Sequence, residues 1–199
     1  MNLILFFNGW GMDEKIVEDV EIPIDYNLEV VNFPYNIDIN LEKYEEIFLA
    51  GWSFGCYYLT KWLNLNKEIL TSSKLKKIIA LNGNSEIIGK YGITPKIFDF
   101  TLDTLTPDSL LKFYTNMGIE KDFKTPQKEF KLIREELEFF KENYTPLENI
   151  FTEIIIGKND KIVPASRQKK YCQEKKIEYK EFNMGHYPFD TIKFWSEIL

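Results

Sequence analysis

Six short stretches of the chain have the composition of β-strands, and their spacing constrains the fold more than any other feature. Residues 3–7 and 47–50 are unbroken apolar runs, which are typical of strands buried on both faces of a parallel sheet, and we interpret residues 28–33 in the same way. Several of them end directly at a turn that contains glycine or asparagine. In chain order the stretches are residues 3–7, 28–33, 47–50, 75–81, 151–156 and 177–182, of which the last is the weakest.

Helical stretches separate or follow these runs. We predict helices over residues 54–65, 164–175 and 189–199. Alternating strands and helices indicate an α/β fold, with a mostly parallel sheet of about six strands and helices on both faces. The 199 residues fit a single domain, residues 1–199. In such sheets ligands bind beyond the carboxyl ends of the strands, so functional groups are expected in the turns there.

Residues 85–149 interrupt the alternation, because they contain no convincing strand and at least two helices. Thr106-Pro107 supplies an N-cap and a first-turn proline for one helix, and Gly118 is its expected end. A second helix is predicted to begin near Thr125-Pro126. Its apolar residues recur on one face, at Phe130, Ile133, Leu137, Phe140 and Tyr144. We interpret residues 85–149 as a helical cap or lid insertion over the strand ends; the alternative is two ordinary packing helices.

The overall charge narrows the classes of partner. The chain carries 25 lysines and arginines against 31 acidic residues, a formal net charge of −6. A nucleic-acid-binding protein needs a basic face, so we expect no nucleic-acid partner. No apolar run approaches the roughly 20 residues of a transmembrane helix, and the N-terminal stretch has no basic region like that of a signal peptide. We therefore expect a cytoplasmic protein with no membrane partner, whose two cysteines are reduced thiols.

The pentapeptide Gly51-Trp52-Ser53-Phe54-Gly55 is the first candidate for chemistry. It follows a buried apolar run and precedes a predicted helix, which is the context of a nucleophile elbow. There a serine sits on a sharp strand-to-helix turn, and glycines two positions away on each side relieve crowding with the neighbouring backbone. The alternative is a serine in an ordinary helix-initiating turn. We favour Ser53 as a nucleophile.

A serine nucleophile needs a base and an acid that orients it. His186 is the only histidine of the chain, and it follows the sixth apolar run in a loop. Asp160 follows the fifth run, so the order Ser53, Asp160, His186 is that of α/β-hydrolases. Asp103 in the insertion is the reserve candidate for the acid. A single histidine, no Cys-X-X-Cys pair and no Gly-X-Gly-X-X-Gly give no support for a metal or a cofactor.

The oxyanion of an acyl-transfer reaction requires two backbone N–H donors. Phe54 follows the serine at the start of a helix, where backbone donors have no partner in the helix. The turn Asn8-Gly9-Trp10-Gly11 follows the first apolar run, and we expect the N–H of Trp10 to be the second donor. A plain glycine turn is the alternative. Trp10 and Trp52 are the predicted substrate-binding side chains.

Four segments together resemble the BioG-type pimeloyl-[acyl-carrier protein] methyl ester esterases of the α/β-hydrolase superfamily. They are FFNGWGMDE near the start, GWSFG at the elbow, ITPKIFDFTLDTLTPDSLLKFYTNM in the insertion and MGHYPF near the end. The resemblance implies a serine carboxylesterase of biotin biosynthesis, which removes a methyl group from pimeloyl-acyl carrier protein. It implies Ser53 as nucleophile, His186 as base, Asp160 as acid and the Trp10 and Phe54 N–H groups as oxyanion donors. Many hydrolases have histidine where this chain has Asn8, and the role of that side chain is left open.

The implied partner is acidic, as is this chain, so docking of the carrier would depend on local basic residues. Lys112, Lys124 and Arg134 in the insertion are the candidates; because acidic residues interleave with them, the alternative is an ordinary solvated helix surface. Two other functions stay open at this point. One is a general short-acyl carboxylesterase or thioesterase with the same triad, and the other is a hydrolase-fold binding protein without turnover.

Overall fold

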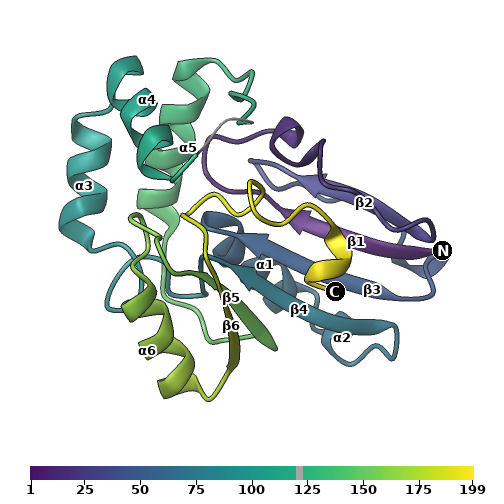
Figure 1. Cartoon of the computed structure of the whole chain (residues 1–199). Helices are drawn as coiled ribbons and strands as arrows, with labels where there is room; N and C mark the ends of the chain where they lie inside the picture. Colours follow the sequence, from purple (N-terminus) through teal and green to yellow (C-terminus); the bar gives the residue numbers. More distant parts are fainter. Residues whose placement is uncertain (120–122) are drawn as a thin grey trace.

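A computed structural model describes residues 1–119 and 123–199. Its six strands form one sheet in the order β2-β1-β3-β4-β5-β6, and every neighbouring pair is parallel (Figure 1). The predicted α/β architecture with a parallel six-stranded sheet is therefore confirmed. The strands are β1 (Asn2–Phe7), β2 (Tyr26–Val31), β3 (Ile47–Trp52), β4 (Leu75–Leu81), β5 (Glu153–Gly157) and β6 (Glu178–Phe182).

The sheet is covered on both faces, and two neighbouring residues of β1 contact the two layers. Side chains alternate along a strand, so Phe6 and Phe7 point to opposite faces. The Phe7 ring lies 5.7 Å from the ring of Trp62 on α1 (Phe54–Leu65). The Phe6 ring lies 5.3 Å from Trp195 and 5.6 Å from Phe189, both in the C-terminal segment. This explains why β1 is apolar at every position from Leu3 to Phe7.

The predicted C-terminal helix over residues 189–199 is wrong. Residues 189–191 form one turn, and after a short extended stretch a single 3₁₀ turn follows, η3 (Trp195–Glu197). The residues before it are extended, because Glu21 pairs with them: its N–H donates to the Lys193 carbonyl (2.8 Å) and its carbonyl accepts from the Trp195 N–H (3.0 Å). This long-range pairing provides backbone partners that a helix would otherwise supply.

The described part of the insertion contains three helices, α3 (Pro95–Asp103), α4 (Pro107–Asn116) and α5 (Phe130–Asn143). Thr94 and Thr106 cap the first two, and a proline follows each cap. The third threonine-proline pair does not begin a helix. Instead the Gln127 N–H donates to the Asp13 carboxylate (2.6 Å), and α5 starts only at Phe130. Residues 120–122 of the predicted insertion lie outside the described residues.

The three helices lie beyond the carboxyl ends of the strands (Figure 1). The predicted apolar face of α5 is real, since Ile133, Leu137 and Phe140 are buried. Phe140 stacks on Phe54, the first residue of α1, with 4.2 Å between ring centroids. The insertion thus packs directly against the start of the helix that follows Ser53.

The remaining elements are shorter or peripheral. They are η1 (Glu14–Val17), η2 (Leu41–Lys43), α2 (Lys67–Leu70) and α6 (Ala165–Lys175), the last lying where a helix was predicted. Each helix in the described part of the chain is too short or too polar to span a bilayer.

Candidate active site

Ser53 occupies a strained turn between β3 and α1. Its φ of 55° and ψ of −122° lie outside the regions that side-chain-bearing residues favour. A Cβ at Gly55 would lie 2.0 Å from the carbonyl oxygen of Phe7, and one at Gly51 would lie 2.8 Å from the Cα of Cys56. Both positions therefore require glycine because backbone passes so close. This is the geometry expected of a nucleophile elbow.

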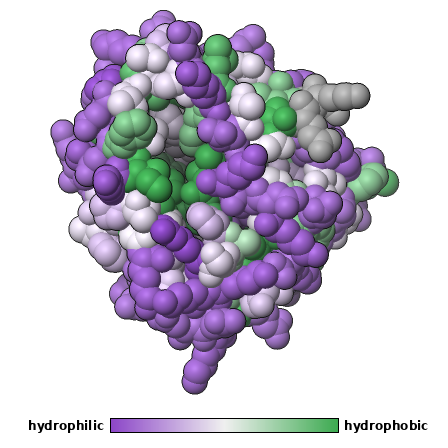
Figure 2. Space-filling view, turned by 60° about the vertical axis from the view of Figure 1, so that its left-hand side comes forward, coloured by the Kyte–Doolittle hydropathy of each residue, from purple (hydrophilic) through white to green (hydrophobic). Residues whose placement is uncertain are grey.

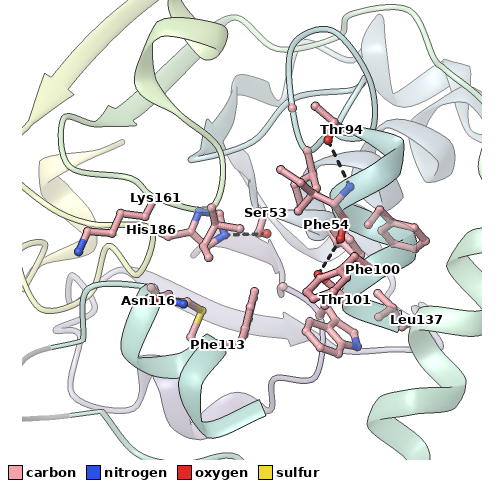
Figure 3. Close-up of a pocket in the computed structure, with 18 of the residues that line it drawn as sticks. Ser53, Phe54, Thr94, Phe100, Thr101, Phe113, Asn116, Leu137, Lys161 and His186 are labelled. Carbon is pink, nitrogen blue, oxygen red and sulfur yellow. Dashed lines mark hydrogen bonds between the residues drawn. The ribbon is translucent and has the colours of Figure 1, made fainter. Parts of the chain in front are cut away.

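A chain of two hydrogen bonds joins the three predicted catalytic side chains. The Ser53 Oγ lies 2.9 Å from the His186 Nε2, and the His186 Nδ1 lies 2.8 Å from the Asp160 Oδ2 (Figure 3). An ionised carboxylate only accepts hydrogen bonds, so the imidazole proton belongs on Nδ1 and Nε2 is left to accept the serine proton. All three side chains are nearly inaccessible to solvent, with His186 only 1 % exposed.

The loop after β5 and the helix α6 fix the Asp160 carboxylate. Its Oδ1 accepts from the backbone N–H groups of Ile162 (2.8 Å) and Val163 (2.9 Å). Its Oδ2 accepts from the Gln168 side chain (3.2 Å) in addition to His186. These bonds restrict the rotation of the carboxylate. Asp103, the reserve candidate, is exposed at the end of α3, and Asp160 makes the contact with His186.

The loop that carries His186 is held by two residues of neighbouring strands. Asn82, just past β4, donates to the carbonyls of Gly185 and His186 (both 2.9 Å) and accepts from the Gly157 N–H (2.6 Å). The indole N–H of Trp52 also donates to the His186 carbonyl (2.8 Å). Trp52, predicted to bind substrate, borders the cavity but is only 1 % exposed, so most of its ring lies against the histidine loop. Sequence reasoning missed Asn82, although the turn Asn82-Gly83-Asn84 at a strand end was visible.

The turn after β1 is organised by the buried Asn8. Its side-chain oxygen accepts from the Gly9 N–H (2.9 Å), and its amide donates to the Asp13 carbonyl (2.8 Å) and the Asn32 side chain (2.9 Å). These bonds answer the question of its role: Asn8 fixes the course of the turn that carries Trp10.

Trp10 and Phe54, the predicted oxyanion donors, both line the same cavity as Ser53. Phe54 is the first residue of α1, so no carbonyl of that helix can accept its N–H. The Trp10 indole donates to the Ile133 carbonyl of α5 (2.8 Å), and its ring packs edge-on against Phe113 of α4 (5.1 Å). Trp10 therefore joins the sheet to the insertion at the cavity wall.

The cavity above Ser53 has a volume of about 490 Å³, within the usual range for small-molecule sites. The elbow, the histidine loop and the insertion helices surround it, and Figure 3 shows Ser53 between His186 on one side and Phe54 on the other. Figure 2 shows a hollow on the side of the molecule that bears α3, with hydrophobic residues gathered round it. Most lining side chains from the insertion are apolar, among them Ile97, Phe98, Phe100, Leu105, Phe113 and Leu137.

The charged residues of the cavity lining are basic, although the whole chain is acidic. Lys112, Lys161 and Arg167 line the cavity, and no aspartate or glutamate of the described residues does. The other two docking candidates are placed differently. Lys124 pairs with Glu18 and with Asp19 (2.7 Å), and the Arg134 guanidinium pairs with Glu138 (2.8 Å). Their charges are balanced locally, and of the three candidates only Lys112 reaches the cavity.

Neither cysteine of the chain competes with Ser53 as a candidate nucleophile. Cys56 is fully buried and donates to the Gly51 carbonyl (3.1 Å), and its burial raises the pKa of the thiol. Burial likewise raises the pKa of Cys172 to about 11, so neither thiol is a thiolate near neutral pH. Within residues 1–119 and 123–199 there is no group of three histidine, cysteine or acidic side chains that could hold a metal ion.

Comparison with solved structures finds similar folds. BioG from Haemophilus influenzae superimposes with a TM-score of 0.83 and 26 % identity, over 99 % of this chain and 94 % of that one. The carboxylesterase CesB from Bacillus subtilis has a TM-score of 0.53 at 11 % identity, over 94 % of this chain and 78 % of that one. The second likeness shows the α/β-hydrolase fold alone.

Sequence comparison finds a relative that is named for a methyltransferase activity. The malonyl-[acyl-carrier protein] O-methyltransferase of Bacteroides fragilis (strain 638R) is 30 % identical over 207 residues. That alignment covers 96 % of this chain but only 40 % of the relative, so the chain spans less than half of that protein. A family model described as pimeloyl-ACP methyl esterase BioG matches residues 1–198. The chain therefore belongs to the BioG family of pimeloyl-ACP methyl esterases, a family of carboxylic ester hydrolases.

Proposed function

We propose that the chain hydrolyses the methyl ester of pimeloyl-acyl carrier protein through an acyl-enzyme formed on Ser53. The observation that carries the proposal is the hydrogen-bonded series Ser53–His186–Asp160 at the wall of an apolar cavity. Family membership over residues 1–198 supports the choice of ester.

In the first half-reaction the Ser53 oxygen attacks the ester carbonyl while His186 Nε2 takes its proton. Asp160 stabilises the imidazolium that forms, through its contact with Nδ1. The carbonyl oxygen becomes an oxyanion, which accepts from the N–H groups of Trp10 and Phe54. Loss of one such donor costs about 10²–10³ in kcat in serine hydrolases.

The tetrahedral intermediate collapses when His186 returns its proton to the methoxy oxygen and methanol leaves. Water then attacks the pimeloyl-Ser53 ester, with His186 as base again, and the free pimeloyl carboxylate remains on the carrier. The pimeloyl chain fits the apolar part of the cavity, which the insertion helices supply.

The basic lining of the cavity supports an acidic carrier as partner. Lys112, Lys161 and Arg167 offer positive charge beside the cavity of a chain whose net charge is −6. Opposite charges on two partners speed their encounter and orient them. The relative from Bacteroides fragilis is named for methylating a carrier-bound acid, and a methyl ester is what such a transfer produces. An esterase of this family would act on a product of that class of reaction.

A direct assay tests the proposal. Purified protein is incubated with pimeloyl-acyl carrier protein methyl ester, and release of the free acid is followed by mass spectrometry. We expect rapid hydrolysis by the wild type, none by Ser53→Ala, and slower turnover of simple acetyl esters. Equal turnover of simple esters would favour a general short-acyl esterase, and no turnover of any ester would favour a binding protein. Restored biotin-independent growth of a host that lacks its own esterase is the corresponding test in cells.

A further inference from the structure

Glu136 of α5 is a buried carboxyl group with no place in the mechanism above. It is 1 % exposed and does not line the cavity. Its Oε2 accepts from the backbone N–H of Gly11 (3.1 Å), the residue after Trp10, and faces the Lys128 ammonium at 3.5 Å. A buried carboxylate is costly unless its contacts compensate. The contact with Gly11 joins the insertion to the turn after β1.

The same helix contacts the turn at two further points. One turn before Glu136, the Ile133 carbonyl accepts from the Trp10 indole (2.8 Å). Gly11 has a φ of +71°, and a Cβ there would lie 3.2 Å from the Ile133 side chain, so the turn lies tightly against α5. Asn8 holds the other end of the turn through the Gly9 N–H. Trp10 is thus fixed between a contact from the sheet side and contacts from the insertion.

Among the described residues, one cation and several hydroxyl groups surround Glu136. Tyr35 in the loop after β2, Tyr58 of α1 and Tyr114 of α4 face it, and Lys128 approaches from just before α5. Burial, and after it the nearby charge of Asp13, raises the pKa of Tyr114. Burial raises the pKa of Glu136 to about 7, while Lys128 and the Gly11 N–H act in the opposite direction. A neutral or apolar residue would stabilise this part of the fold more, which argues for a functional reason to keep the carboxyl group.

We propose that Glu136 is a positioning residue, which holds the turn at Gly11 so that the Trp10 N–H points at the developing oxyanion. The proposal rests on the proposed function, in which Trp10 supplies that donor. Through this contact the position of α5 in the insertion determines the position of the donor. A shift of α5 would therefore move the apolar wall of the cavity and the oxyanion donor together.

The test compares Glu136→Leu, which removes the acceptor, with Glu136→Gln, which keeps one of similar shape. Hydrolysis of a short p-nitrophenyl ester is measured, so that no carrier docking is involved. We expect Glu136→Leu to lower kcat about 10- to 100-fold, less than loss of a whole donor, with KM changed less than about twofold. Glu136→Gln should restore most of kcat. Glu142→Leu, the same change at an exposed position of α5, is the matched control and should leave kcat unchanged.

A second measurement covers the case in which Glu136→Leu does not fold. The Gly11 amide proton should resonate downfield in the wild type and remain hydrogen-bonded in Glu136→Gln. Wild-type kcat in folded Glu136→Leu would overturn the proposal, as would an unbonded Gly11 amide in a fully active Glu136→Gln. In either case an inactive Ser53→Ala would leave the proposed function intact. If the wild type cleaves no ester, the proposed function itself fails, and the amide resonance still reports whether Glu136 holds the turn.

Discussion

Replacing Asn82 by alanine tests the scaffold that holds the histidine loop. Asn82 is fully buried and makes three hydrogen bonds, two as donor to the carbonyls of Gly185 and His186 and one as acceptor from the Gly157 N–H. Its φ of 46° lies in the left-handed region, which asparagine tolerates better than alanine. The substitution therefore removes side-chain contacts and adds backbone strain.

The magnitude follows from the groups left behind. The Gly157 N–H is buried and loses its acceptor, at a cost of about 1–3 kcal/mol. The His186 carbonyl keeps the bond from the Trp52 indole, so its loss is small. The left-handed conformation adds about 1–2 kcal/mol for alanine. We expect Asn82→Ala to lower the free energy of unfolding by about 2–5 kcal/mol, with a lower kcat because the histidine loop is less constrained.

Urea denaturation followed by tryptophan fluorescence measures this change, with ester hydrolysis measured in parallel. Asn82→Gly is the matched variant, since it loses the same hydrogen bonds without the strain at positive φ, and it should be about 1 kcal/mol more stable than Asn82→Ala. A loss below about 1 kcal/mol in Asn82→Ala, together with unchanged kcat, would refute the role assigned to Asn82.

Three further predictions concern charged groups. The pKa of Glu136 in the folded protein is about 7 against an ordinary 4.5, so its ionisation lowers the free energy of unfolding as pH rises through this range. At pH 8.5 the free energy of unfolding in urea should be about 3 kcal/mol higher for Glu136→Gln than for the wild type, and the difference should vanish near pH 4.5. Asp160→Asn should lower kcat by about 10³–10⁴, because an amide cannot hold the same imidazole tautomer, while Asp103→Asn keeps full activity; the reverse result would transfer the role of the acid. Lys112→Glu should raise KM for the carrier-bound ester several-fold at low salt, but it should leave KM for a short ester unchanged. Lys124→Glu changes a lysine that is already paired with acidic side chains, so it should have little effect on KM for either ester. If the two variants raised KM for the carrier-bound ester equally, docking of the carrier beside the cavity would be contradicted.

The predictions from sequence succeeded where the signal is local. The apolar run of residues 3–7 marks the end of β1 at Phe7, whereas the runs predicted to end at residues 50 and 156 stop two residues and one residue before the ends of β3 and β5. The elbow glycines act on backbone only a few residues away or on the neighbouring strand. The contact between His186 and Asp160 could be expected because both follow adjacent strands of a parallel sheet.

Residues that support the site could not be predicted, because their contacts join distant parts of the chain. Asn82 reaches a loop 103 residues away, and Glu136 reaches a turn 125 residues away. Neither lies in a motif that points to its partner. The prediction of a C-terminal helix was wrong for the same reason, because pairing of Glu21 with the distant Lys193 overrides the local preference for a helix.

Labelling with a fluorophosphonate tests the central claim most directly. At pH 8 the wild type should take up one equivalent of the probe, and mass spectrometry of peptides should place the adduct on Ser53. Ser53→Ala should take up none, and His186→Ala should react far more slowly, because the serine then lacks its base. An adduct on any other residue, or hydrolysis of the methyl ester by a protein that the probe does not label, would contradict the account.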